Sequence, residues 1–337
     1  MTPSRVESLC DRHAIEPARA PEPMPFSSRT WLVEDSGGGR WVIKLCEENE
    51  AARRHLRDFS VLHPPFLYPR PLDDAGTENL LYPYLPGEIA AEADFESEEA
   101  VRWALETAAR VQALARSLVL ASQYEEALRP RGSEAESLER FSQRHRLGAT
   151  LFHDEKRKRE RLEEAARSRS WTVERTRRCC QGIRNGPGWP EDLLAEFRER
   201  MEKAFSIHLP VFGNNLAHTD FHPEHLLRSP DGAPGVTGWR IGPRPRFFMI
   251  HTYLAWSLLH SRRPRAVQFY SDCVEDLGRK AFFQEHHLVA AFCVLDRLVL
   301  KIETEDVGEG ERRVEEAGAF FASCMAKLRG KTESSGF

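Results

Sequence analysis

The stretch that decides the fold is AHTDFHPEHLL, residues Ala217 to Leu227. It places Asp220 among three histidines, His218, His222 and His225, with a second acid, Glu224, just before the last of them. Such a cluster suits a metal site, a phosphoryl-transfer loop or a histidine-rich bend with a purely structural role. The spacing H-x-D-x-H-x-x-H is not a common zinc signature, so the surrounding sequence has to decide between these readings.

Upstream of this motif the chain has a proline-dotted tail and then a β-rich segment. Two β-rich runs, Thr30 to Val33 and Trp41 to Leu45, flank an Asp-Ser-Gly-Gly-Gly turn, which predicts a hairpin. We expect a helix over Glu47 to Leu62, ended by two prolines, and a further strand over Asn79 to Tyr84. The segment from Thr30 to Gly87 therefore predicts a small sheet with one helix.

The rest of the chain is helical in pattern. Apolar residues recur at the helical period from Val101 to Leu118, and another amphipathic helix is expected over Glu191 to Ser206. The stretch from Arg129 to Ser170 is dominated by charges of both signs, which is typical of a solvated helix face. Three more helical patterns follow the motif, at Val267 to Phe283, Glu285 to Glu303 and Glu311 to Arg329.

The bulk composition is that of an ordinary globular chain. Its 337 residues are 41% hydrophobic and 30% charged, with a net charge of -4, so there is no overall field for nucleic acid or an anionic membrane. Seven cysteines without a C-x-x-C spacing favour reduced thiols. No apolar run is long enough to span a bilayer, and the N-terminus lacks a hydrophobic signal segment, so we expect a cytoplasmic protein.

The order of these parts, a small β-rich lobe and then a helical lobe with a His-x-Asp loop, is that of the protein kinases. The motif resembles the H-G-D-x-H-P-x-N-[IVL]-L loop of the aminoglycoside phosphotransferase and choline kinase families, and the resemblance covers roughly Ser27 to Leu259. It implies an α+β, two-lobed, protein-kinase-like fold. Residues 1–87 would form the tail and the N-lobe with a hinge near 80–87, and residues 88–337 would form the helical C-lobe with the loop at 217–227.

The resemblance also implies an activity, the ATP-dependent phosphorylation of a hydroxyl group on a small molecule. Asp220 would accept the proton of the acceptor hydroxyl, and His218 stands beside it in the catalytic loop. Within the loop, His218 is more often a structural residue that bonds the backbone, and His222 more often packs below it.

Other segments imply nucleotide contacts. Lys44 in VIKL would hold the α- and β-phosphates, and Asp58 in RDFSVL would pair with that lysine. The hinge in LLYPYLPGE, around Tyr82 and Tyr84, would bond the adenine edge through its backbone, and the loop that contains Ser27 and Ser28 would approach the phosphates. A plain alternative for Lys44 is a solvated lysine on an edge strand.

The sequence departs from the family pattern at the metal site. Aligning VTG with the V-x-G of the family's V-x-G-V-I-D-W-E strand places Ile241 on the metal-binding aspartate, and no Asp or Glu occurs from Gly232 to Ser271. His225 occupies the position of the metal-binding Asn, although Mg²⁺ and Mn²⁺ prefer oxygen ligands. The same stretch holds arginines such as Arg240, whose guanidinium groups could neutralise phosphate or bind an anionic partner.

Two functions of different classes follow. The chain is either a phosphotransferase with a reworked metal site, in which His225 and Arg240 compensate, or an inactive pseudokinase that binds a nucleotide or a protein partner. A nucleic-acid site on Arg157 to Arg161 and Arg175 to Arg178 is a weaker alternative, which would show strongly salt-dependent affinity. No membrane partner is expected.

Overall fold

The structure is a computed structural model, and it describes residues 3–24, 30–45, 79–85, 87–112, 172–183, 189–207, 215–230, 234–238, 241–245, 247–281, 286–304 and 310–334. The chain divides into two compact units, which are treated separately below. The first unit comprises Met1–Ala93 and Glu224–Arg240, and the second comprises Asp94–Pro223 and Ile241–Phe337. The helix predicted over residues 47–62 and the charged stretch 129–170 lie outside the described residues.

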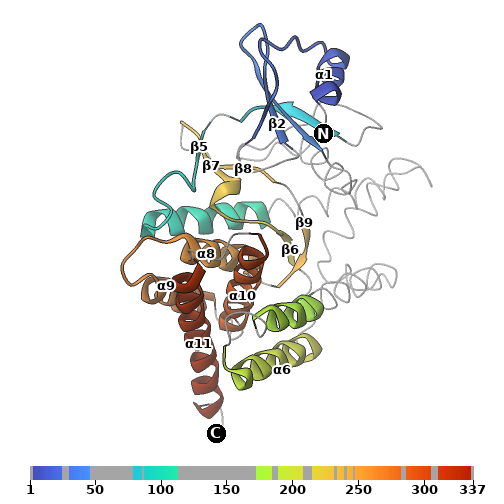
Figure 1. Cartoon of the computed structure of the whole chain (residues 1–337). Coiled ribbons are helices and arrows are strands. Elements are labelled where there is room, and N and C mark those ends of the chain that lie inside the picture. The colour runs from blue at the N-terminus through green and yellow to red at the C-terminus, as the bar shows by residue number, and fades with distance from the viewer. Residues whose placement is uncertain are drawn as a thin grey trace, which may run out of the picture. The chain divides into compact units, whose positions relative to one another are not determined.

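The first unit is built on a four-stranded antiparallel sheet (Figure 1). Its strands are β1 (Glu22–Pro23), β2 (Thr30–Glu34), β3 (Arg40–Leu45) and β4 (Asn79–Pro83), and they are paired in that order. The register of β2 and β3 runs from Thr30 opposite Lys44 to Glu34 opposite Arg40. The predicted hairpin and the predicted strand after it are therefore confirmed.

The hairpin turn owes its shape to Asp35. The carboxylate of Asp35 accepts hydrogen bonds from the Gly39 amide at 2.7 Å and from the indole N-H of Trp41 at 2.8 Å. Gly38 has a φ of 83°, and a Cβ on Gly39 would lie 2.4 Å from a carboxylate oxygen of Asp35. These bonds lower the pKa of Asp35, chiefly through Trp41, and the two glycines are required by backbone conformation and by close approach.

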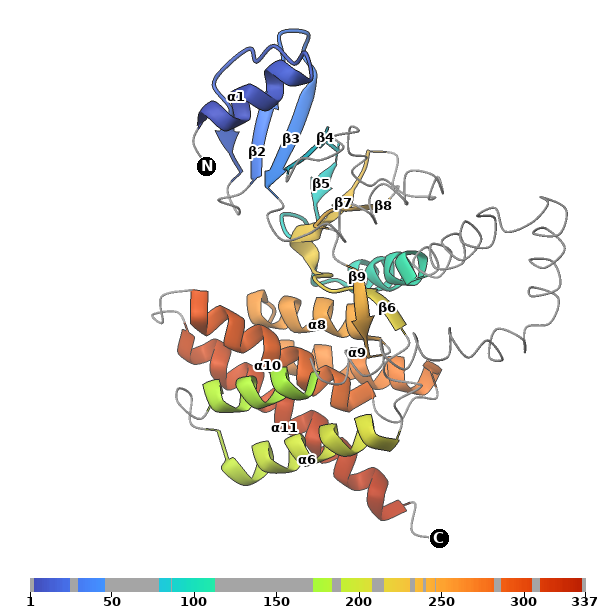
Figure 2. The same cartoon turned by 90° about the vertical axis from the view of Figure 1, so that its right-hand side faces the viewer.

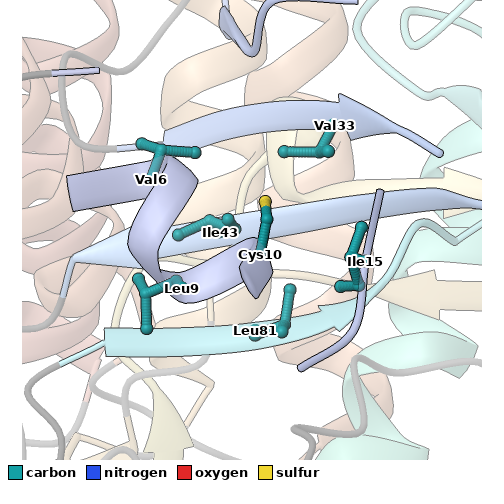
Figure 3. Close-up of a cluster of buried hydrophobic side chains, with 7 residues drawn as sticks. All are labelled: Val6, Leu9, Cys10, Ile15, Val33, Ile43 and Leu81. Atoms are coloured by element: carbon teal, nitrogen blue, oxygen red, sulfur yellow. The ribbon is translucent and has the colours of Figure 1, made fainter. Parts of the chain in front are cut away.

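One face of this sheet is covered by a helix in the segment that the sequence indicated to be a tail. Helix α1 (Pro3–Arg12) directs Val6, Leu9 and Cys10 onto the strands (Figure 3). The buried cluster consists of Val6, Leu9, Cys10, Ile15, Val33, Ile43 and Leu81. The expectation of a tail was wrong. Helix α1 has only ten residues and few apolar positions, and the proline-rich stretch that follows it indicated an irregular segment.

A second, smaller sheet also belongs to the first unit. Strand β7 (Leu226–Arg228), which ends the sequence motif, pairs with β5 (Glu88–Ile89) on one side and β8 (Pro234–Val236) on the other. The turn before β5 requires Gly87, because its φ is 150° and a Cβ there would lie 2.9 Å from the carbonyl oxygen of Arg228.

The second unit is mostly helical (Figures 1 and 2). Residues 98–112 and 172–183 are helical. The named helices are α6 (Glu191–Ile207), α8 (Phe248–His260), α9 (Ala266–Ala281), α10 (His286–Thr304) and α11 (Gly310–Ser334). The helices predicted at the positions of α6, α9, α10 and α11 are thus confirmed to within a few residues at each end. A small sheet followed by a mostly helical region confirms the α+β class.

Helix α8 was not predicted as a helix, and the reason is its burial. All of its residues from Phe248 to Leu259 are buried. A helix that is covered on every side carries no apolar and polar periodicity, which is the signal that identifies an amphipathic helix. Helix α10 packs against both α8 and α11, so this part of the unit is a bundle with α10 at its centre.

The six cysteines among the described residues are free thiols, as expected. Burial raises the pKa of Cys179, Cys293 and Cys324, so these thiols stay protonated and pack as small apolar side chains. Within the described part of the chain, no helix is both long and apolar enough to cross a membrane.

Three buried histidines gather where α8 meets α10. His251 on α8 is 1% exposed, and its ring stacks on that of His286, which in turn contacts His287. His287 Nε2 lies 3.2 Å from a carboxylate oxygen of Glu275 on α9, and Lys327 on α11 is 3.6 Å from the same oxygen. Neither ring nitrogen of His251 has a hydrogen-bond partner among the described residues, and burial lowers its pKa well below the ordinary value.

We expect Leu9→Ala to loosen the first unit, because this side chain is 3% exposed in the cluster between α1 and the sheet. Removing a buried leucine side chain costs about 2–5 kcal/mol. Hydrogen exchange of the β2, β3 and β4 amides should accelerate, whereas Glu7→Ala, at an exposed position of the same helix, should leave it unchanged. Equal exchange in the two variants would contradict the packing of α1 on the sheet.

We expect the second unit to lose stability as the pH falls below about 6.5, the ordinary histidine pKa, because the unfolded chain then binds a proton that folded His251 does not. One such proton contributes a slope of about 1.4 kcal/mol per pH unit. His251→Leu should remove that part of the slope of unfolding free energy against pH, measured in urea between pH 5 and 7. An identical slope in the two proteins would show that His251 does not titrate differently on folding.

Candidate active site

The motif begins on a strand whose partner fixes the rest of the site. Strand β6 (Asn215–His218) pairs antiparallel with β9 (Ile241–Arg244), with His218 opposite Ile241 and Asn215 opposite Arg244. Two residues beyond β6 the chain reaches Asp220. The register therefore places the backbone of Ile241 directly beside the start of the loop, at the position predicted from the sequence to have lost its aspartate.

Asp220 is held in place by a cation from a distant part of the sequence. Arg297 Nη2, on α10, donates to Asp220 Oδ1 at 2.6 Å, and His222 Nε2 lies 3.2 Å from the same oxygen. The Arg297 side chain is 9% exposed and that of Asp220 is 31% exposed. The carboxylate is thus anchored from the protein interior and still partly open to solvent.

His218 turns the loop. Its side chain is fully buried, and its Nδ1 accepts a hydrogen bond from the backbone amide of Asp220 at 3.2 Å. The edge of its ring meets Phe221, which is also buried. His218 thus acts on the backbone beside Asp220, and this position supports the structural reading of this residue.

Below the loop, the rings of His222, Trp256 and His260 form a stack on α8, and the stack ends at a lysine of α10. His222 stacks parallel to Trp256 with ring centroids 5.9 Å apart, and Trp256 stacks on His260 at 4.0 Å. Lys301 Nζ, one helical turn after Arg297 on α10, lies 3.3 Å from His260 Nε2. His222 packs below the loop as expected, and the stack ties it to the same helix that holds Asp220.

His225 belongs to the first unit, where it packs against the segment after β8. Its carbonyl oxygen accepts the Thr237 amide at 2.9 Å. Gly238 has a φ of 63°, and a Cβ there would come within 2.8 Å of the His225 ring. The glycine of VTG is therefore required by the imidazole that stands in the asparagine position.

The hinge strand has an edge that can bond a ligand. Strand β4 is the end strand of its sheet among the described residues, and the Tyr84 amide donates to the Arg40 carbonyl at 2.8 Å. Main-chain groups alternate in direction along an antiparallel strand, so those of Leu81 and Pro83 are directed away from β3. A proline, which has no N-H, is compatible with such an edge.

The side chains of the two tyrosines in the predicted hinge contact the sheet. Tyr82 is 7% exposed and stands opposite Val42 in the β3–β4 pair. The ring of Tyr84 lies under the guanidinium of Arg40, 4.0 Å from the ring centroid. The outward main-chain groups of β4 thus come from the residues next to these tyrosines.

Lys44 lies in β3, opposite Thr30 and Leu80. Strand β3 has β2 on one side and β4 on the other, so the reading of Lys44 as an edge-strand lysine is wrong. Four further predicted contacts, Ser27, Ser28, Asp58 and Arg240, lie outside the described residues.

In the second unit, the part of the motif up to Pro223 and strand β9 do not by themselves fit a magnesium site of the expected kind. Among residues 215–223 and 241–245, Asp220 is the sole acid, and its Oδ1 is already bonded by Arg297. Mg²⁺ requires several oxygen ligands, whereas a guanidinium beside the carboxylate repels a divalent cation. The position expected to supply the second carboxylate is Ile241.

The arginines near this region are mostly committed to protein contacts. Arg244 on β9 is partly buried, and desolvation lowers its pKa to about 10, so it remains charged at neutral pH. Arg263 donates to the Glu96 carbonyl at 2.6 Å and lies over the Phe269 ring. Arg175, Arg177 and Arg178 each contact a carboxylate, which disfavours the nucleic-acid reading for this segment.

Arg297 was missed by sequence reasoning, although a signal was present. Helix α10 reads HHLVAAFCVLDRLVLKIET, in which Asp296 and Arg297 interrupt an apolar run. Charged residues inside a buried helix face are rare unless they are paired. The pair was visible in the sequence, but its partners, Arg175 for Asp296 and Asp220 for Arg297, are far away along the chain.

Comparison with known proteins identifies the family and the fold. The model of the phosphotransferase enzyme family, APH, matches residues 23–239. Among solved structures, a GDP complex of an aminoglycoside 2'-phosphotransferase IIIa variant has a TM-score of 0.52 at 12% identity, with 98% of this chain and 99% of that chain covered. Choline kinase from Cryptosporidium parvum Iowa II has a TM-score of 0.50 at 11% identity, with 99% and 97% covered. No curated protein matches the sequence.

Proposed function

Because this chain belongs to the phosphotransferase enzyme family, with the protein-kinase-like fold of its structural neighbours, we propose that it transfers a phosphoryl group from ATP to a hydroxyl group of a small molecule. The acceptor oxygen forms the new bond to the γ-phosphorus, and the bond to the bridging oxygen of ADP breaks. The hydroxyl proton passes to Asp220. The observation that carries the proposal is this carboxylate at the end of β6, fixed by Arg297 and partly exposed.

The first unit supports a nucleotide-binding role of its own. The outward edge of β4 offers the carbonyl oxygens of Leu81 and Pro83, which suit the exocyclic amino group of adenine. Lys44, on the interior strand β3, is the residue proposed for the phosphates. The structural neighbour that was solved with GDP supports a nucleoside phosphate as the ligand class.

The metal that this family's chemistry calls for would normally supply positive charge to the phosphates. In this chain residues 215–223 and β9 offer a single carboxylate, Asp220, which Arg297 already binds, so we assign no step to the metal. What the chain's own residues do is hold a carboxylate in a fixed direction, keep the loop packed on α8 and α10, and leave part of Asp220 accessible to an acceptor.

A second candidate function is favoured by one observation, the hydrocarbon residue Ile241 at the metal-ligand position beside His218. A chain of this kind would bind a nucleotide or a protein partner without turnover. The two functions differ in what a nucleotide does after it binds, so a turnover measurement separates them.

We expect Asp220→Asn to abolish ATP turnover while ATP still raises the melting temperature. Loss of a positioned general base lowers the rate by about 10²–10⁴-fold. ADP release would be followed with an aminoglycoside, with choline and with water alone as acceptor, each with and without Mg²⁺ or Mn²⁺. Asp272→Asn, an exposed acid on α9, is the matched control and should turn over like the wild type. Wild-type protein that binds ATP and releases no ADP would refute the transferase and support the second function.

We expect the double variant Ile241→Asp with His225→Asn to make ATP binding depend on Mg²⁺, because it restores two oxygen ligands of the family pattern. ATP-induced stabilisation should then be larger with Mg²⁺ than with EDTA, whereas in the wild type the two should be equal. Ile241→Asn with the same His225→Asn change introduces no second carboxylate and is the control. A wild-type response to Mg²⁺ as large as that of the double variant would contradict the metal-site analysis.

A further inference from the structure

We infer that Arg297 is a positioning residue for catalysis, which fixes the Asp220 carboxylate and places a permanent positive charge beside it, where family members rely on a metal ion. This inference rests on the proposed phosphoryl transfer, since it assigns Arg297 a role in the same site. The juxtaposition that carries it is the 2.6 Å contact between Arg297 Nη2 and Asp220 Oδ1, across 77 residues of sequence.

The anchor is rigid. Arg297 is 9% exposed and lies between Asp296 and Leu298 on α10, a helix in which the residues from Leu288 to Leu295 are all buried. A guanidinium is planar, permanently charged and less free to reorient than an ammonium once it is packed. The carboxylate of Asp220 is therefore held by a side chain of α10 and not by a residue of its own loop.

The charge balance of the loop gives this anchor a second consequence. In the part of the loop that belongs to the second unit, residues 217–223, Arg297 pairs with Asp220, while the loop's other acid, Glu224, belongs to the first unit. A transferring phosphoryl group adds negative charge near the base, and an additional carboxylate without a metal would repel it. Arg297 thus offsets the charge of Asp220 without a bound cation.

Arg175 provides a comparison on the same helix. It forms a part-buried ion pair with Asp296, the neighbour of Arg297, and its side chain is 17% exposed. The side chains of adjacent helix residues point in different directions. Asp296 therefore pairs with Arg175 on the helix at 172–183, whereas Arg297 pairs with Asp220 in the catalytic loop. The two pairs are similar in chemistry and burial, but only the pair with Arg297 includes Asp220.

The test compares Arg297→Gln and Arg175→Gln in the full chain. We expect Arg297→Gln to lower kcat about 100-fold, because moving a catalytic group by about 1 Å can reduce the rate by that factor. The KM for ATP should change little. Arg175→Gln should lower the melting temperature by about as much as Arg297→Gln does, but its kcat should stay within about threefold of the wild type. Arg297→Lys, which keeps the charge but not the planar geometry, should give a kcat between those of wild type and Arg297→Gln.

The outcomes separate this inference from the proposed function. If the wild type turns over ATP and Arg297→Gln turns over as well as Arg175→Gln, the positioning role is overturned and the transferase stands. If the wild type shows no turnover with any acceptor or with water, both the proposed function and the role of Arg297 in it are overturned. If Arg297→Gln does not fold, Arg297→Lys decides: a lowered kcat at unchanged KM supports the role, and a wild-type kcat overturns it.

Discussion

The site depends on one main-chain constraint, the antiparallel pairing of β6 with β9. This pairing ends at His218, whose imidazole accepts the Asp220 amide, so the catalytic-type loop leaves the sheet in a defined direction. The same register sets Ile241 beside the loop. Because these hydrogen bonds are made by the main chain, the pairing does not require a particular side chain at position 241.

A lone carboxylate on a partly buried loop needs a counter-charge, and in this chain the counter-charge is a buried arginine on α10. Removing one partner of such a pair leaves the other charge buried without compensation, and this strongly destabilises the folded state. Asp220 and Arg297 therefore depend on each other, whatever ligand the protein binds.

Helix α10 links several features that look unrelated in the sequence. Its first turn carries His286 and His287 of the histidine cluster, its middle carries Asp296 and Arg297, and Lys301 follows one turn later. The partners of these polar residues lie on several neighbouring elements, while the apolar residues between them pack in the bundle. A helix with several packed neighbours can satisfy its buried charges through them.

The sequence by itself determined the order of the elements, the glycine-dependent hairpin, the periodic helices, the family to which AHTDFHPEHLL belongs and the absence of an acid from Gly232 to Ser271. Those features are local, and local spacing is readable without contacts. It did not reveal α1 as a cover for the sheet or α8 as a helix, since one is short and the other has no polar face. Only the tertiary structure decided that Asp220 would be paired with Arg297, because an ion pair between residues so far apart leaves no periodic signal and depends on how β6, β9 and α10 pack together.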